Sequence, residues 1–279
     1  MGLIFGATLP QREFKNDVSS IREFALGIEE LGLSYLRVAD QVIEPKGGGF
    51  HEPLMLLSYL SAATSKLELV PSVLVAPSRQ TALLAKQIAE LDLLSDGRIR
   101  LGLGLGGNLQ EYRAMGRPMA RRGRRLEEQI LLLRNLWRGK QIYHKGEFEK
   151  FNGVRLSPRL KRESIPIWLG LSARPPGSAL KRVGTLADGW FAMCDRDSFE
   201  SLNKIVLDAA ERNGRSPSDV GAECEISILK HSSIGLRGEI NRWIDLGVTH
   251  ICLSTLGFLG DCASHLDLLA ESLEVLSIN

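Results

Sequence analysis

The sequence has few of the features that mark a membrane, secreted or nucleic-acid-binding protein. Its longest aliphatic runs, such as Ile130–Leu133, are far shorter than the ~18 residues of a membrane span. The net charge is only +2, from 35 Lys and Arg against 33 Asp and Glu, so no overall field favours nucleic acid or a membrane surface. The start of the chain lacks the basic region of a signal peptide. We therefore expect no membrane or nucleic-acid partner and a cytoplasmic location.

Cysteine is also scarce, and its spacing is uninformative. A chain of 279 residues can build a core without disulfides, and the cysteines form no Cys-x-x-Cys pair. We expect buried thiols in a reducing compartment and no metal site. The four residues are Cys194, Cys224, Cys252 and Cys262.

What is present is a regular alternation of short strand-like segments and longer amphipathic segments. Several strand-like segments are apolar throughout, which is typical of parallel strands buried on both faces. Eight strand–helix units can close into a (β/α)8 barrel, whereas a doubly wound sheet more often has fewer strands, so we favour one α/β barrel domain over residues 1–279. The expected strands are Leu3–Leu9, Tyr35–Ala39, Leu67–Val75, Ile99–Leu105, Ile165–Gly170, Gly189–Met193, Glu223–Leu229 and Thr249–Ser254.

The amphipathic segments predict the helices that cover this barrel. After the fourth unit the alternation breaks, and two β-like pieces within Gln141–Pro158 predict an inserted hairpin, with the insertion covering about 139–164. The expected helices are Asp17–Leu31, Leu54–Ala63, Thr81–Leu94, Arg124–Trp137, Ser178–Leu186, Phe199–Arg212, Leu236–Leu246 and Leu266–Leu276.

In such a barrel the active site lies where the strands end. The predicted strand ends have few acids, no cluster of metal ligands and no Ser/His/Asp set, but many glycines and small polar residues. This composition favours a large cofactor that brings its own chemistry. The positions are Pro10-Gln11, Asp40-Gln41, Ala76-Pro77, Gly106-Gly107-Asn108, Gly170-Leu171-Ser172, Cys194-Asp195, Lys230-His231 and Ser254-Thr255.

Three glycines after the fourth strand, Gly102, Gly104 and Gly107, match the GxGxxG dinucleotide pattern. A Rossmann motif opens a helix at once and has an acid about 20 residues further on, at the end of the next strand. Here a glycine and a proline interrupt the next segment, and the acids at that distance lie inside a predicted helix. Two interpretations remain: close packing at the barrel mouth, or a flat surface for a ring.

The loop Gly170–Ser178 precedes a helix and carries two serines and Arg174. Free backbone N–H groups at the helix start, with a nearby guanidinium, would bind phosphate. The alternative is simple N-capping of the helix by Ser178.

An arginine-rich segment lies before and at the start of the fourth helix. It is either a solvated loop or a clamp for a polyanionic cofactor tail. Its members are Arg113, Arg117, Arg121, Arg122, Arg124 and Arg125.

Two histidines, His51 and His231, are expected on the same side of the barrel as the strand ends. Each is a candidate proton donor, and the alternative is a polar loop residue.

Several segments, in order along nearly the whole chain, resemble the luciferase-like monooxygenase superfamily. The most specific is AKQIAELDLLSDGRIRLGLGLG, residues 85–106. The others include Leu9-Pro10-Gln11, Ala39-Asp40-Gln41, the helix with Arg124, Glu128 and Leu136-Trp137, Pro166–Ala173 and Ala187–Trp190.

The resemblance implies a barrel with an insertion after the fourth unit that binds FMN or the deazaflavin coenzyme F420 at the strand ends. The similarity is greatest to probable deazaflavin-dependent oxidoreductases, in which a non-prolyl cis peptide, here at Ser72-Val73, backs the ring. The implied cofactor-binding residues are Asp40, Gln41, Ser72, Val73, Gly106, Gly107 and Asn108 near the ring, and Gly170, Leu171, Ser172, Gly177 and Ser178 near the phosphate.

The chain departs from its relatives at two positions. Gln41 replaces a histidine that many relatives have, and Gly107 replaces a glutamate of some deazaflavin-dependent sugar dehydrogenases. The resemblance then favours hydride transfer between F420 and a small organic substrate, more specifically reduction of an activated C=C or C=N bond. The proton would come from water, His51 or His231.

The resemblance leaves two alternatives open. One is an FMN-dependent monooxygenase served by a separate flavin reductase, and the other is a non-catalytic flavin-fold binding protein. It further implies a homodimer. The substrate pocket would be built by the Gly47–His51 loop, the Arg113–Arg121 segment and the inserted hairpin.

Overall fold

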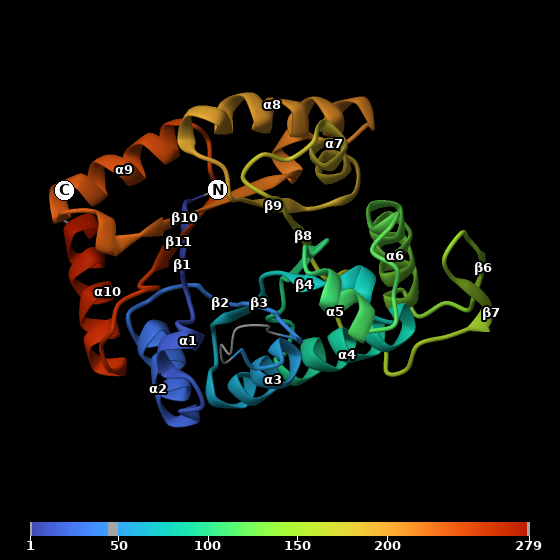
Figure 1. The fold of residues 1–279 in the computed structure, drawn as a ribbon, viewed down its shortest axis with the longest axis horizontal. Helices are drawn as coiled ribbons and strands as arrows, with labels where there is room; N and C mark the ends of the chain where they lie inside the picture. Colours follow the sequence, from blue (N-terminus) through green and yellow to red (C-terminus); the bar gives the residue numbers. More distant parts are fainter. Residues whose placement is uncertain (1, 44–49, 278–279) are drawn as a thin grey trace.

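The computed structural model describes residues 2–43 and 50–277. Within this part, nine parallel strands form a nearly closed barrel, with the helices outside it (Figure 1), as the sequence predicts. The sheet order is β3-β2-β1-β11-β10-β9-β8-β5-β4. The strands are β1 (Ile4–Thr8), β2 (Tyr35–Val38), β3 (Glu68–Pro71), β4 (Leu74–Val75), β5 (Leu101–Gly104), β8 (Ile167–Gly170), β9 (Gly189–Ala192), β10 (Gly221–Ser227) and β11 (His250–Ser254).

The third strand differs from the prediction because it is divided. β3 pairs with β2, whereas β4 pairs with β5, and the peptide bond Ser72–Val73 between them is cis. At the other end of the barrel the ring is completed by Leu69, whose N–H donates to Arg98 O at 2.7 Å and whose carbonyl accepts from Arg100 N at 3.3 Å. The expected strand Leu67–Val75 is therefore two short strands that join different neighbours.

The helices surround the barrel, and α8, α9 and α10 begin three or four residues earlier than predicted. Asp195 accepts from Ser198 N at 2.8 Å, and Asp261 accepts from Ser264 N at 2.9 Å, so these caps set the starts of α8 and α10 before the first large apolar residue. The helices are α1 (Gln11–Phe14), α2 (Val18–Glu30), α3 (Pro53–Ala63), α4 (Thr81–Leu94), α5 (Leu109–Ala114), α6 (Arg122–Trp137), α7 (Gly177–Leu186), α8 (Arg196–Arg212), α9 (Ser233–Asp245) and α10 (Cys262–Ser277), with short 3-10 turns at Ala76–Ser78, Pro217–Asp219 and Ile228–Lys230.

The predicted hairpin is present as the antiparallel pair β6 (Ile142–Lys145) and β7 (Lys150–Val154), beside α6. Glu128 of α6 fixes it by accepting hydrogen bonds from His144 Nε2 at 3.0 Å and from Glu149 N at 2.9 Å. Burial alone would raise the pKa of Glu128, but these bonds lower it. The hairpin tip thereby lies against the start of α6, where Glu147 also pairs with Arg121 and Arg124.

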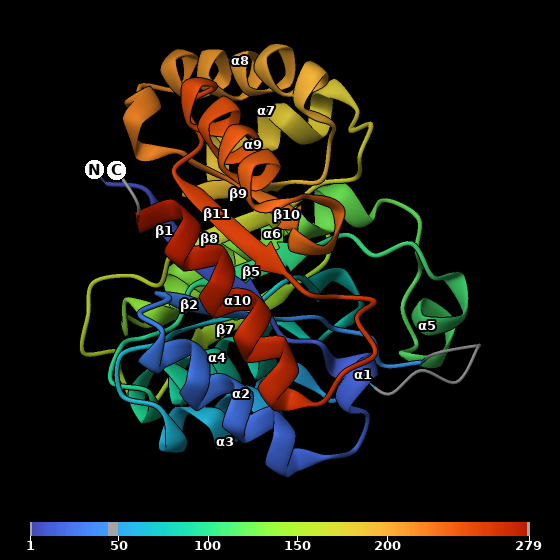
Figure 2. The same ribbon diagram turned by 90° about the vertical axis from the view of Figure 1, so that its left-hand side faces the viewer.

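Apolar residues form two cores, one between the barrel and the helices and one inside the barrel. In the outer core α2 packs beside α10 (Figure 2). An ideal Cβ at Gly27 of α2 would overlap the side chain of Leu266, so glycine permits this close packing. None of the helices in the described ranges combines the length and the apolar character that a membrane span needs. The inner core contains Tyr35, Val70, Trp168, Phe191 and Cys252.

Candidate active site

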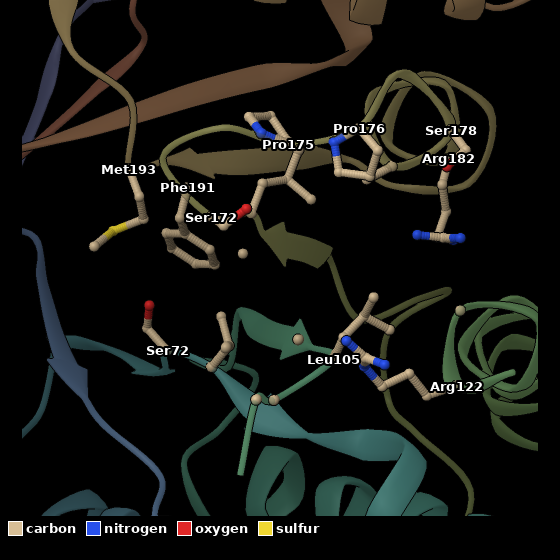
Figure 3. A pocket seen from close by; sticks show the side chains of 18 of the residues that line it. Ser72, Leu105, Arg122, Ser172, Pro175, Pro176, Ser178, Arg182, Phe191 and Met193 are labelled. Atoms are coloured by element: carbon tan, nitrogen blue, oxygen red, sulfur yellow. The ribbon is translucent and has the colours of Figure 1, made fainter. Parts of the chain in front are cut away.

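A first cavity of about 740 Å³ opens at the mouth of the barrel (Figure 3), between the ends of β4, β5, β8 and β9 and the starts of α6 and α7. Most of the cofactor-binding positions implied by the resemblance come together on its wall. They are Ser72, Val73, Gly106, Gly107, Gly170, Leu171, Ser172 and Ser178.

Close packing explains why two of the wall positions are glycine. An ideal Cβ at Gly104 would lie 2.3 Å from Val73 Cγ2, and one at Gly170 would lie 2.6 Å from Val73 Cγ1. A Cβ at Gly102, deeper in the barrel, would lie 2.3 Å from the carbonyl oxygen of Pro71. At Gly107, by contrast, a Cβ would meet no described atom within 4 Å. The packing interpretation therefore holds for Gly102 and Gly104, and the open surface is at Gly107.

Asp40 supports this wall from behind. Its carboxylate pairs with Arg79 Nη2 at 2.8 Å and accepts from Val75 N at 3.0 Å, and its side chain is only 1% exposed. It thus fixes the backbone after Val73 and is absent from the lining of the first cavity as the described residues define it.

Gln41 and Asn108 also lie away from the first-cavity lining that the described residues form. Both amide groups donate to the carbonyl of Ile43 at 3.3 Å, and the oxygen of Asn108 caps α5. Gly177 begins α7 but is not part of that lining either. Residues 44–49, which include most of the expected Gly47–His51 loop, lie outside the described residues.

The start of α7 contributes a polar wall. Pro176 occupies the N-cap, and among the described residues no side chain caps this helix, so the N-capping role considered for Ser178 is wrong. Ser178 and Arg182 of α7 face the cavity together with Arg122 of α6 (Figure 3). Backbone N–H groups and two guanidinium groups therefore meet on one side of the cavity.

The arginine-rich segment divides between two environments. Arg121 and Arg122 line the first cavity. Arg122 is weakly engaged, with a hydrogen bond of 3.4 Å to the carbonyl of Met119. Arg125 instead is buried against the hairpin, with Nη2 2.9 Å from Glu149 Oε1. The segment is thus partly structural and partly available to an anion.

A second cavity of about 330 Å³ lies next to the first, between the ends of β9 and β10 and the helices α8 and α9. His231 lines it, whereas His51 lies elsewhere, with its ring Nε2 3.1 Å from the carbonyl of Lys15. The structure therefore does not bring the two candidate histidines together, and their role as proton donors stays a prediction.

Sequence reasoning missed a charged cluster inside the barrel. Arg37 Nη1 lies 3.1 Å from Glu223 Oε1 and 3.1 Å from Glu225 Oε2, and its Nε donates to Ser72 Oγ at 3.1 Å. Burial alone would lower the pKa of Arg37, but the nearby Cys252, Glu223 and Glu225 raise it. The available signal was a pair of acids at alternate positions of an otherwise buried strand, Glu223 and Glu225, which places both inside the barrel.

Comparisons with known proteins agree with this geometry. F420-dependent glucose-6-phosphate dehydrogenase of Mycolicibacterium gilvum (strain PYR-GCK) is 31% identical over 240 residues, 81% of this chain and 70% of that protein. At the level of the fold alone, the chain is similar to an F420-dependent secondary alcohol dehydrogenase in complex with an F420-acetone adduct (TM-score 0.86, 15% identity, 99% of each chain). It is likewise similar to the EDTA monooxygenase of Chelativorans sp. BNC1 (TM-score 0.82, 13% identity, 100% of this chain and 95% of that one). Because the family model for luciferase-like monooxygenases also matches residues 4–229, the chain belongs to the luciferase-like monooxygenase family.

Proposed function

We propose that this protein is an oxidoreductase that binds coenzyme F420 in the first cavity and transfers hydride between it and a small organic substrate. The reaction we favour is reduction of an activated C=C or C=N bond. A relative and a similar structure, both named as F420-dependent, support this choice of cofactor. One observation carries the proposal: the same cavity has a glycine-rich wall and, on another side, arginines beside the start of a helix that no described side chain caps.

The glycine wall fits a flat ring. Gly104 and Gly170 hold Val73 between them, and Gly107 adds an open stretch of backbone. Such a wall offers an apolar surface without projecting side chains, which a planar ring needs for close contact. Asp40 and Arg79 keep the backbone behind it in place.

The opposite wall fits an anion. The first N–H groups of α7 carry the positive end of the helix dipole, and in the described structure they have no side-chain cap. Ser172, Ser178, Arg122 and Arg182 surround the same space. Arg182 is itself fixed by Glu127, with Nε 2.8 Å from Oε1, so its guanidinium is preorganised. These residues would hold the phosphate and the anionic tail of the coenzyme.

When bound, the coenzyme supplies the hydride chemistry, and the protein supplies orientation and electrostatics. The wall at Val73 would cover one face of the ring. The other face would be left toward the second cavity, where Met193 lines both spaces.

Titration of the purified protein with F420 and with FMN, followed by fluorescence, tests the proposal. We expect tighter binding of F420. Arg182→Gln and Arg122→Gln should each weaken F420 binding by about ten- to a hundredfold, because each removes a charge-assisted hydrogen bond. The matched control is Arg138→Gln, an exposed arginine at the far end of α6. Unchanged affinity in both cavity variants would contradict the anion wall.

The same titration separates the alternatives. Tighter binding of FMN would favour the alternative of a monooxygenase that works with a separate flavin reductase. The family model and the EDTA monooxygenase structure support the monooxygenase part of this alternative. Bound F420 without turnover of a panel of enones and imines would favour a non-catalytic binding protein. The homodimer and the cytoplasmic location stay predictions, and size-exclusion chromatography with light scattering tests the first.

A further inference from the structure

The charged cluster inside the barrel carries an excess of negative charge. Among the described residues, the guanidinium groups of Arg37 and Arg100 face the carboxylates of Glu68, Glu223 and Glu225. Glu223 is held by both arginines, at 3.1 and 2.9 Å, and each arginine also pairs with one further acid, Glu225 at 3.1 Å or Glu68 at 2.8 Å. Two positive charges against three negative charges leave one negative charge over.

Glu225 is the acid of this cluster that faces a cavity. It lines the second cavity, and its side chain is 25% exposed. Its Oε2 accepts from Thr8 Oγ1 at 3.5 Å and pairs with Arg37, whereas its Oε1 has no partner among the described residues. Oε1 therefore remains free to accept a hydrogen bond from a ligand in the second cavity.

The second cavity also adjoins the proposed ring site. Met193 lines both cavities, at the end of the first cavity that lies away from Arg182 (Figure 3). Arg37 lines the first cavity and binds Glu225, so the carboxylate lies at the junction. Arg196, a positive group of the second-cavity wall, has Nη1 2.7 Å from Glu239 Oε2, and Lys230 lies exposed at the rim. The unpaired oxygen at the junction therefore favours a cationic or hydrogen-donating group.

We propose that the second cavity binds the substrate as a protonated imine, a C=N bond whose N–H donates to Glu225 Oε1. This inference rests on the proposed function and selects C=N over C=C. Hydride from the reduced coenzyme forms the new C–H bond at the imine carbon, and the π electron pair moves to nitrogen. The cation becomes a neutral amine with no proton transfer. Reduction of an activated C=C bond would instead need a separate proton donor for the carbanion or enolate that hydride addition leaves.

Binding of the amine product class to the protein without coenzyme tests the site directly. The probe is 2-methylpyrrolidine, added as its hydrochloride and measured by isothermal titration calorimetry. Glu225→Gln should weaken its binding by about ten- to a hundredfold, since a charge-assisted hydrogen bond is lost. The matched control is Glu239→Gln in the same cavity, because that carboxylate is already engaged by Arg196, Arg242 and Trp243 Nε1. Equal affinity of Glu225→Gln and the wild type would overturn the inference.

Two further measurements keep this result interpretable. Glu225→Gln should retain the F420 affinity of the wild type, which shows that the variant is folded and that the coenzyme site is intact. With reduced F420 the wild type should turn over 2-methyl-1-pyrroline faster than 2-cyclohexen-1-one, and the reverse preference would overturn the inference. F420 binding without amine binding would refute the imine site alone. Amine binding without F420 binding would refute the proposed function and leave the cation site standing.

Discussion

Near its mouth, the barrel interior has one side without charge and one side rich in charge. On the side of β4, β5 and β8 the wall consists of Val73 with Gly104 and Gly170. On the side of β1, β2 and β10 it carries Thr8, Arg37 and Glu225. The first side provides a flat apolar surface, and the second provides charged and polar groups. One barrel can thereby present a flat surface to a ring and a charged group to whatever lies on the ring's other face.

The largest expected effect on stability comes from removing an arginine from the charged side. Arg37→Met should lower the free energy of unfolding by about 3–5 kcal/mol, because it leaves Glu223 and Glu225 in a buried site with one partner fewer. Urea denaturation followed by circular dichroism measures this loss. The control is Arg138→Met at the exposed end of α6, which should change stability by less than about 0.5 kcal/mol. If both variants lost the same amount, Arg37 would not organise the cluster.

The next largest effect on stability comes from adding a methyl group to the uncharged side. Gly104→Ala should cost about 1–3 kcal/mol by overpacking, because the new Cβ would lie 2.3 Å from Val73 Cγ2. Val73 cannot turn away, since Gly170 confines its other methyl group. Gly107→Ala is the matched control and should leave the unfolding midpoint nearly unchanged, because its Cβ meets no described atom within 4 Å. If Gly104→Ala lowered the stability no more than Gly107→Ala does, Val73 would be free to move.

The two sides differ in how far the sequence predicts them. Apolar periodicity locates the strands and most helices, and the glycine pattern draws attention to Gly102, Gly104 and Gly107. The reason for two of these glycines lies in Pro71 and Val73, about 30 residues earlier, and becomes visible only when the strands are adjacent. Spacing within one segment carries no information about that approach.

The charged side is not predictable in the same way, because its residues lie within strands and not in the loops that follow them. Arg37 and Glu225 lie within β2 and β10, and their meeting requires the closed barrel. The starts of α8 and α10 were misplaced for a related reason. A capping aspartate precedes the first apolar residue of each helix, so hydrophobic periodicity alone starts the helix too late.

The smallest effect concerns His250, which begins β11 at the opposite end of the barrel and lies near Arg100. Burial, helped by the positive charge of Arg100, lowers the pKa of His250 to about 3, so the folded protein keeps its ring neutral while the unfolded chain protonates it near pH 6.5. The unfolded state then binds more protons than the native state between these values, and stability falls as pH falls through this range. Below about pH 6, His250 should therefore lower the free energy of unfolding of the wild type by about 1.4 kcal/mol for each unit that the pH falls. The variant His250→Gln should lack this contribution. Urea denaturation of both proteins at pH 7.5, 6 and 5 measures the difference. Parallel pH profiles would mean that the His250 ring becomes charged in the folded barrel as readily as in the unfolded chain.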